Sequence, residues 1–203
     1  LSSEAYREGT AVLLAAGSCL AAWRWGHCPL PRGLFGAGWA EEMVPLAVAA
    51  ANTSTVELRT SIAIAFARSP MVSANLAWDL QRASNGNFTL GIGSQVKGHN
   101  IRRFSVPWSA PAPRMREYVQ AVRAIWDCWQ NGTKLDYQGE HYQFSLMTPN
   151  FTPEPCEYGT PKVQIAAVGP VMMKVYGQGS MATSMPQGVP SEAAEGPTID
   201  VVD

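Results

Sequence analysis

The chain has 203 residues, a formal net charge of −1, 46% hydrophobic residues and 15% charged residues. This length allows one domain with a sizeable core, and the composition excludes a highly charged, disordered chain. A near-zero net charge offers no field for gathering nucleic acid or anionic lipid. We therefore expect a small-molecule partner, and neither nucleic acid nor a membrane.

The cysteines and an N-terminal apolar run bear on the compartment. The four cysteines include no Cys-x-x-Cys pair and have no histidine at zinc spacing, so we expect a reducing, cytoplasmic setting and no metal site. Residues 11–23 have the length of a signal-peptide core, but Glu4, Arg7 and Glu8 before them make a poor positive leader. The run is also shorter than the ~20 apolar residues of a membrane span.

Three regions differ in pattern along the chain. Residues 1–42 mix Trp, Gly and Pro without a clear period, and we expect irregular structure there around one helix within 10–23. Residues 43–177 carry clear periodic patterns and form the predicted domain. Residues 178–203 are rich in Gly, Ser, Pro and Met, which predicts an irregular tail.

The first half of the predicted domain alternates helices with strands. A helix follows Pro45 through the segment LAVAAAN, and residues 56–66 are typical of a parallel strand that is buried on both faces. Ser69 and Pro70 are the N-cap and first residue of the next helix, which ends at the turn SNGN. The segment FTLGIG, residues 88–93, then forms a second strand.

The second half begins with a loop to about residue 110 and a long amphipathic helix. Apolar residues recur at three- and four-residue steps from Met115 to Trp129, and Asn131-Gly132 ends the helix. A hairpin, a proline-rich loop, a strand and a short helix follow, at residues 134–144, 147–161, 162–169 and from 170. Strands that alternate with helices predict parallel βα units and therefore an α/β fold.

The segment LGIGSQVKGH invites comparison with a nucleotide-binding turn. Gly91-x-Gly93 ends a strand, but a Rossmann fingerprint needs a third small residue where Val96 stands. The chain also lacks a Gly-Lys-Ser/Thr phosphate loop, a His-Glu-x-x-His motif and a Gly-x-Ser-x-Gly elbow. Asp136 and Glu140 flank the hairpin turn, and we interpret them as surface charges.

Three predicted strands end in small or polar residues, at 63–67, 91–95 and 166–170. In parallel βα architectures the ligand lies at the carboxyl ends of the strands, so these three ends together predict a shared pocket. The loop after the second strand carries four basic or titratable residues: Lys97, His99, Arg102 and Arg103. They could bind a phosphate or carboxylate, with His99 moving protons, or they could form an ordinary solvated loop.

A family likeness is carried by the segments TSIAIAFARSPMVSANLAWDLQRASNGNFTLGIGSQVKGHNIRRF, YQGEHYQF and PKVQIAAVGP. Over about residues 43–175 they resemble the luciferase-like monooxygenase superfamily, and within it the F-420 (deazaflavin)-dependent oxidoreductases. The resemblance implies an α/β fold, a partial (β/α)₈ TIM barrel with parallel strands and an inserted β-hairpin. It further implies coenzyme F-420, or alternatively FMN, and hydride transfer to or from an organic substrate, or monooxygenation with FMN. It leaves a homo-oligomer open.

The resemblance also implies site residues. Similar proteins carry a bulge, often with a cis peptide, at the end of the strand that matches residues 61–66, and two further strand ends line the same pocket. The candidate cofactor-binding residues are therefore Ala63, Ile64, Ala65, Gly91, Gly93, Ser94, Gln95, Ala167, Val168 and Gly169. Deazaflavin dehydrogenases carry a glycine and a proton-transferring glutamate where this chain has Gln95 and Val96. His99 is the candidate catalytic residue in place of that glutamate.

The ends of the chain depart from the family pattern. The first strand of such relatives is not recognisable before the helix at Pro45, nor is the second half of the barrel after Pro170. The alternative to an enzyme is thus a catalytically inactive barrel fragment, which acts as a binding or interaction module through exposed sheet edges.

Overall fold

A computed structural model of the chain describes residues 12–15, 43–167 and 171–175. The rest of the predicted irregular segment 1–42 and the predicted tail lie outside the described residues, as do Val168 and Gly169. The predicted domain bounds of 43–177 therefore stay a prediction.

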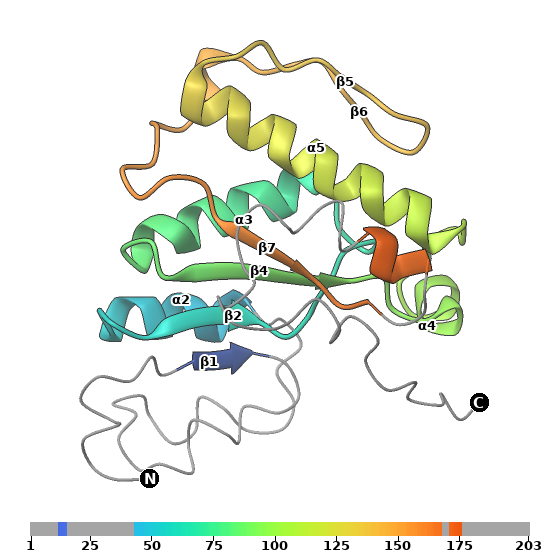
Figure 1. Ribbon diagram of the computed structural model, residues 1–203, viewed down its shortest axis with the longest axis horizontal. Helices are drawn as coiled ribbons and strands as arrows, with labels where there is room; N and C mark the ends of the chain where they lie inside the picture. The colour runs from blue at the N-terminus through green and yellow to red at the C-terminus, as the bar shows by residue number, and fades with distance from the viewer. Residues whose placement is uncertain (1–11, 16–42, 168–170, 176–203) are drawn as a thin grey trace, which may run out of the picture.

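Five parallel strands form one sheet (Figure 1): β1 (Val12–Ala15), β2 (Glu57–Thr60), β3 (Ala63–Ile64), β4 (Phe88–Gly93) and β7 (Lys162–Ile165). Strand β4 is central, because its Ile92 pairs with Ala63 on one side and with Ile165 on the other. Strands β2 and β3 therefore follow one another along the same edge of β4. The predicted parallel α/β arrangement is confirmed.

Strand β1 corrects two sequence-based expectations. The helix expected within 10–23 is wrong at residues 12–15, which form a strand with Val12 opposite Glu57 of β2. A strand that the sequence did not reveal is therefore present before the helix at Pro45. A short apolar run such as VLLA has no period that separates a helix from a buried strand.

The predicted strand 56–66 is broken into β2 and β3 by a cis peptide bond between Ser61 and Ile62. The expectation of burial on both faces is wrong for β2, whose burial alternates between neighbouring residues. Glu57 and Arg59 share one face and form an ion pair at 2.6 Å, while Leu58 on the other face is fully buried. The consecutive apolar residues at 62–66, which predicted burial on both faces, lie after the break.

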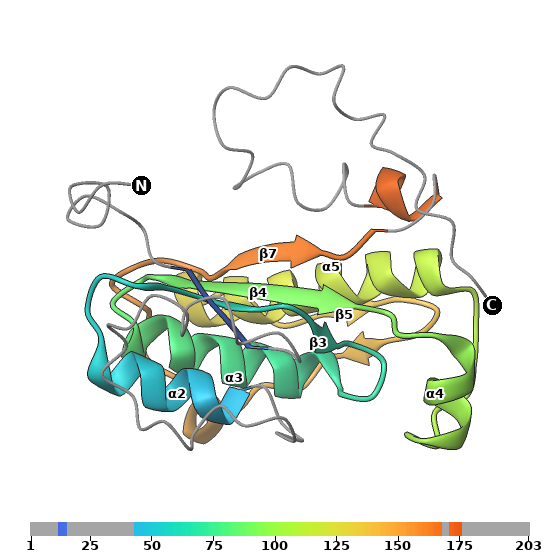
Figure 2. The same cartoon turned by 90° about the horizontal axis from the view of Figure 1, so that it is seen from below.

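Three helices pack in sequence over one side of the sheet (Figures 1 and 2): α2 (Met43–Asn52), α3 (Pro70–Ala83) and α5 (Pro111–Asn131). The predicted N-cap is confirmed, since the Ser69 side chain accepts a hydrogen bond from the Met71 amide at 3.3 Å. The predicted end of α5 is confirmed as well. Gly132 adopts a left-handed conformation with φ of 69°, which glycine reaches without strain.

The predicted loop 94–110 is partly helical, because α4 (Lys97–Arg102) forms directly after β4. The predicted hairpin is confirmed as the antiparallel strands β5 (Tyr137–Gln138) and β6 (Gln143–Phe144). A short 3₁₀ turn, η1 (Pro149–Phe151), lies within the proline-rich loop. Residues 171–175 are helical, as predicted.

Buried tryptophans pack between α3 and α5. Trp78 and Trp129 meet edge to face, with ring centroids 5.4 Å apart. Trp126 is also buried and donates its indole N–H to the Ala74 carbonyl at 3.2 Å. This packing fixes the helices against β4 and so holds the strand ends where the sequence predicts a ligand.

Candidate functional site

The break between β2 and β3 is bridged by a threonine side chain. The Thr60 hydroxyl donates to the Gly91 carbonyl at 2.6 Å and accepts from the Gly91 amide at 2.8 Å. It therefore takes the place of the two ladder hydrogen bonds that a continuous strand would supply. Gly91 has to be a glycine, since a Cβ there would overlap the Thr60 backbone carbonyl.

The cis peptide between β2 and β3 lies slightly earlier than the candidates drawn from the sequence. The cis peptide joins Ser61 to Ile62, whereas Ala63 and Ala65 beyond it are buried and only Ile64 is half-buried. Ile62 is 38% exposed and is the residue whose side chain faces the strand end. Sequence reasoning missed Ile62, because no local pattern marks which peptide of such a segment is cis.

Ile62 and Gly93 lie against each other across the two strands. A Cβ on Gly93 would overlap the Ile62 Cδ1 atom, so the missing side chain of Gly93 is what admits Ile62. The backbone ladder continues past this point, with the Ala65 amide donating to the Gly93 carbonyl at 2.9 Å. The edge is therefore formed by a bare backbone with one aliphatic side chain beside it.

The turn after β4 is held by a buried asparagine. Asn100 of α4 is fully buried, and its side-chain amide donates to the Ser94 carbonyl at 2.9 Å and to the Val96 carbonyl at 3.1 Å. Gln95 between them has a positive φ of 59°. Such a conformation is uncommon for a residue other than glycine and orients the backbone of Ser94 and Gln95 at the strand end.

The end of β7 completes the same edge. The Ala166 amide donates to the Ile92 carbonyl at 2.8 Å, which places Ala167 beside the end of β4. The structure thus brings together the described candidates from all three strand ends. Whether they bind a cofactor stays a prediction.

His99 lies on α4, shortly after the Ser94–Val96 turn, and is exposed. Within the described part of the chain its imidazole ring makes no hydrogen bond. Lys97 and Arg102 on the same helix are exposed. The basic residues of the predicted loop are therefore arranged by a helical turn.

Sequence reasoning also missed Arg114 of α5. Its guanidinium carbon lies 4.4 Å from the centroid of the Phe66 ring, directly beyond β3, and its Nε donates to the Tyr142 hydroxyl at 2.9 Å. Burial raises the pKa of Tyr142, although the Arg114 hydrogen bond opposes this shift. Arg114 thereby ties the strand end to the hairpin, a contact between residues too distant in sequence to show a motif.

Burial has the same effect on a second tyrosine, Tyr118 of α5. Burial raises its pKa well above the ordinary range, and the hydrogen bond with Ser73 at 2.6 Å only partly offsets that effect. The hydrogen bond between the Tyr118 and Ser73 hydroxyls joins α5 to α3. Tyr118 therefore acts as a structural hydrogen-bonding group and not as an acid near neutral pH.

Comparison with known families shows the family to which this chain belongs. The model of the family described as luciferase-like monooxygenase matches residues 20–195. The chain belongs to the luciferase-like monooxygenase family. This match extends beyond the predicted domain on both sides, and it agrees with the family resemblance read from the sequence.

An uncharacterised protein from Mycobacterium tuberculosis is 52% identical over 154 residues, which cover 73% of this chain and 45% of that protein. This chain thus spans less than half the length of that relative.

No helix of the described residues is long and apolar enough to cross a membrane.

Two solved structures show the fold. The coenzyme F420-dependent tetrahydromethanopterin reductase of Methanopyrus kandleri has a TM-score of 0.53 and 20% identity, covering 66% of this chain and 41% of that one. A Baeyer–Villiger monooxygenase component of Pseudomonas putida, solved with FMN, has a TM-score of 0.54 and 14% identity, covering 66% and 40%. The structure is therefore part of a luciferase-like TIM barrel, as the sequence predicted.

Proposed function

We propose that this luciferase-like chain carries the cofactor-binding strand ends of an oxidoreductase that uses coenzyme F-420 and transfers a hydride to or from a small organic substrate. The observation that supports this most is the construction of the β3 and β4 ends. Thr60 and Gly91 permit the break in the strand, and Ile62 then lies beside the bare backbone of Gly93.

The described residues fit a flat redox ring. Two glycines whose Cβ atoms would collide with neighbours, a partly exposed aliphatic side chain and a positive-φ turn leave a smooth backbone edge. Ile62, Gly93, Ser94 and Gln95 would hold the ring, with Ala167 beside them. The cofactor supplies the hydride chemistry when bound, and the protein supplies binding, orientation and exclusion of water.

Proton handling is the part of the proposal that rests on His99. Neither Gln95 nor Val96 titrates, so the position of the family's glutamate carries no acid. His99 follows that turn on α4, and an imidazole ring can both donate and accept a proton. If His99 moves protons at the substrate, His99→Ala leaves cofactor affinity within about twofold and lowers turnover of alcohol or ketone substrates.

F-420 is favoured over FMN by the sequence resemblance to the deazaflavin-dependent oxidoreductases. The known structures similar to this chain include an F420-dependent reductase and an FMN-containing monooxygenase, so both cofactors belong in the test. With FMN the same site would support monooxygenation of an organic substrate. The competing proposal is an inactive barrel fragment that serves as an interaction module.

Binding of purified protein to F-420 and to FMN, followed by fluorescence titration, tests the proposal. We expect saturable binding that is tighter for F-420. Gly93→Val should weaken binding by about five- to 150-fold, because a branched side chain would occupy the space of the ring at this edge, at a cost of about 1–3 kcal/mol. Ala47→Val, which introduces the same side chain on the exposed side of α2, serves as the control and should change affinity less than about twofold. Binding of neither cofactor would support the inactive fragment instead.

A further inference from the structure

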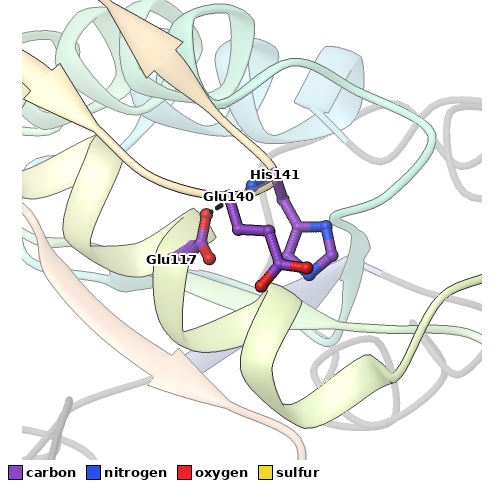
Figure 3. Close-up of side chains that lie close together, drawn as sticks. All are labelled: Glu117, Glu140 and His141. Atoms are coloured by element: carbon purple, nitrogen blue, oxygen red, sulfur yellow. Dashed lines mark hydrogen bonds between the residues drawn. The ribbon is translucent and has the colours of Figure 1, made fainter.

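A cluster of two carboxylates and one imidazole joins helix α5 to the hairpin (Figure 3). Glu117 projects from α5, while Glu140 and His141 stand in the turn between β5 and β6. Their ligand atoms all lie within 4.8 Å of one another. None of these residues belongs to the candidate cofactor site. The sequence predicted no metal site, because Glu117 comes from a different element than Glu140 and His141.

The turn is shaped to approach Glu117. The His141 backbone amide donates to Oε2 of Glu117 at 2.7 Å, and the Gly139 amide closes the turn by donating to the Tyr142 carbonyl at 2.9 Å. Gly139 is also placed so that a Cβ would overlap the Glu117 carboxylate. Glu117 is therefore fixed in position by one carboxylate oxygen, which leaves the second oxygen available as a ligand.

The donor set determines the class of ion. A nitrogen from imidazole together with carboxylate oxygens suits Zn²⁺ and similar transition metals, whereas Mg²⁺ and Ca²⁺ prefer oxygen-only shells. Zinc binds such donors at about 2.0–2.2 Å, so the cluster has to contract slightly. Rotation of the exposed Glu140 side chain provides this movement.

We propose that Glu117, Glu140 and His141 form a zinc-binding site that clamps the hairpin to α5. Three protein ligands leave the fourth tetrahedral position for water. The neighbouring residue Tyr142 bonds Arg114, which stacks on Phe66 at the end of β3. The clamp therefore stabilises the hairpin at the point where it reaches the strand ends. It does not depend on the proposed cofactor.

Isothermal titration of the untagged, chelator-treated chain with ZnCl₂ tests this site, with MgCl₂ as the hard-ion comparison. We expect one equivalent of zinc to bind at least about tenfold more tightly than magnesium. His141→Ala should weaken zinc binding at least about tenfold, since it removes the nitrogen ligand. His99→Ala removes an imidazole outside the cluster and is the matched control, with an expected change below about twofold.

Thermal unfolding in the presence and absence of zinc keeps the test independent of folding defects. Glu140→Gln alters only an exposed side chain, so its Tm without metal should equal that of the parent. Zinc should raise the Tm of the parent and of His99→Ala, but not that of Glu140→Gln or His141→Ala. The proposal is overturned if the parent binds no stoichiometric zinc, or if His141→Ala binds zinc as tightly as the parent does.

Discussion

Replacing Thr60 by valine isolates the hydrogen bonds that bridge the broken strand. The substitution keeps the shape of the side chain but removes the hydroxyl that bonds both the amide and the carbonyl of Gly91. Thr60 is 1% exposed, so water cannot replace the lost partner. Each buried backbone group left without a partner costs about 1–3 kcal/mol, and with two such groups we expect Thr60→Val to destabilise the fold by roughly 2–6 kcal/mol.

Urea unfolding measures this loss. With a slope of about 1–3 kcal/mol per molar urea, the midpoint should fall by roughly 1 M or more while the slope stays constant. Thr55→Val makes the same atomic change at an exposed threonine nearby and should stay within about 0.5 kcal/mol of the parent.

The order of two Thr60 variants discriminates between hydrogen bonding and packing. Thr60→Ser keeps the hydroxyl and loses a methyl group, which costs about 1 kcal/mol in a buried position. If the bridge stabilises the fold, Thr60→Ser is more stable than Thr60→Val. If packing alone matters, valine is the better replacement, and a more stable Thr60→Val would refute the reasoning.

Three further variants test other parts of the fold. Ser69→Ala removes the cap that accepts from the Met71 amide and should cost about 1 kcal/mol in urea unfolding, against little change for an exposed serine elsewhere. Trp126→Ala empties the packed layer between α3 and α5, and calorimetry should show a loss of about 3–5 kcal/mol. The Asp127 pKa is lowered, first by the hydrogen bond from Thr133, so its stabilisation is present above the unfolded pKa and is lost as pH falls through the folded pKa. Asp127→Asn should therefore reduce the acid-side slope of stability below about pH 4, and an unchanged slope would contradict this assignment.

Local patterns were sufficient to predict the elements whose signals lie close together in the chain. The cap at Ser69, the left-handed end at Gly132 and the period of α5 each depend on neighbouring residues, and all three are confirmed. The parallel arrangement follows from the alternation of strands and helices. These features need no knowledge of the rest of the fold.

Features that depend on distant contacts were not predictable in the same way. Strand β1 gains its identity from pairing with β2, since VLLA by itself suits either a helix or a strand. The helical turn α4 is held by Asn100, whose side chain reaches back to the carbonyls of Ser94 and Val96. Arg114 meets Phe66 only after the chain has folded. In each case tertiary contacts outweigh local preference.

The two glycines of β4 are there for different structural reasons, although they belong to one short motif. Gly91 faces the backbone carbonyl of Thr60, which cannot move without breaking the sheet. The fold therefore requires a residue without a side chain at position 91. Gly93 faces the far end of the Ile62 side chain, which can rotate away. A substitution at Gly93 can therefore leave the fold intact and still alter the surface that would contact a ring. This difference is why Gly93→Val, and not a change at Gly91, separates a binding defect from a folding defect.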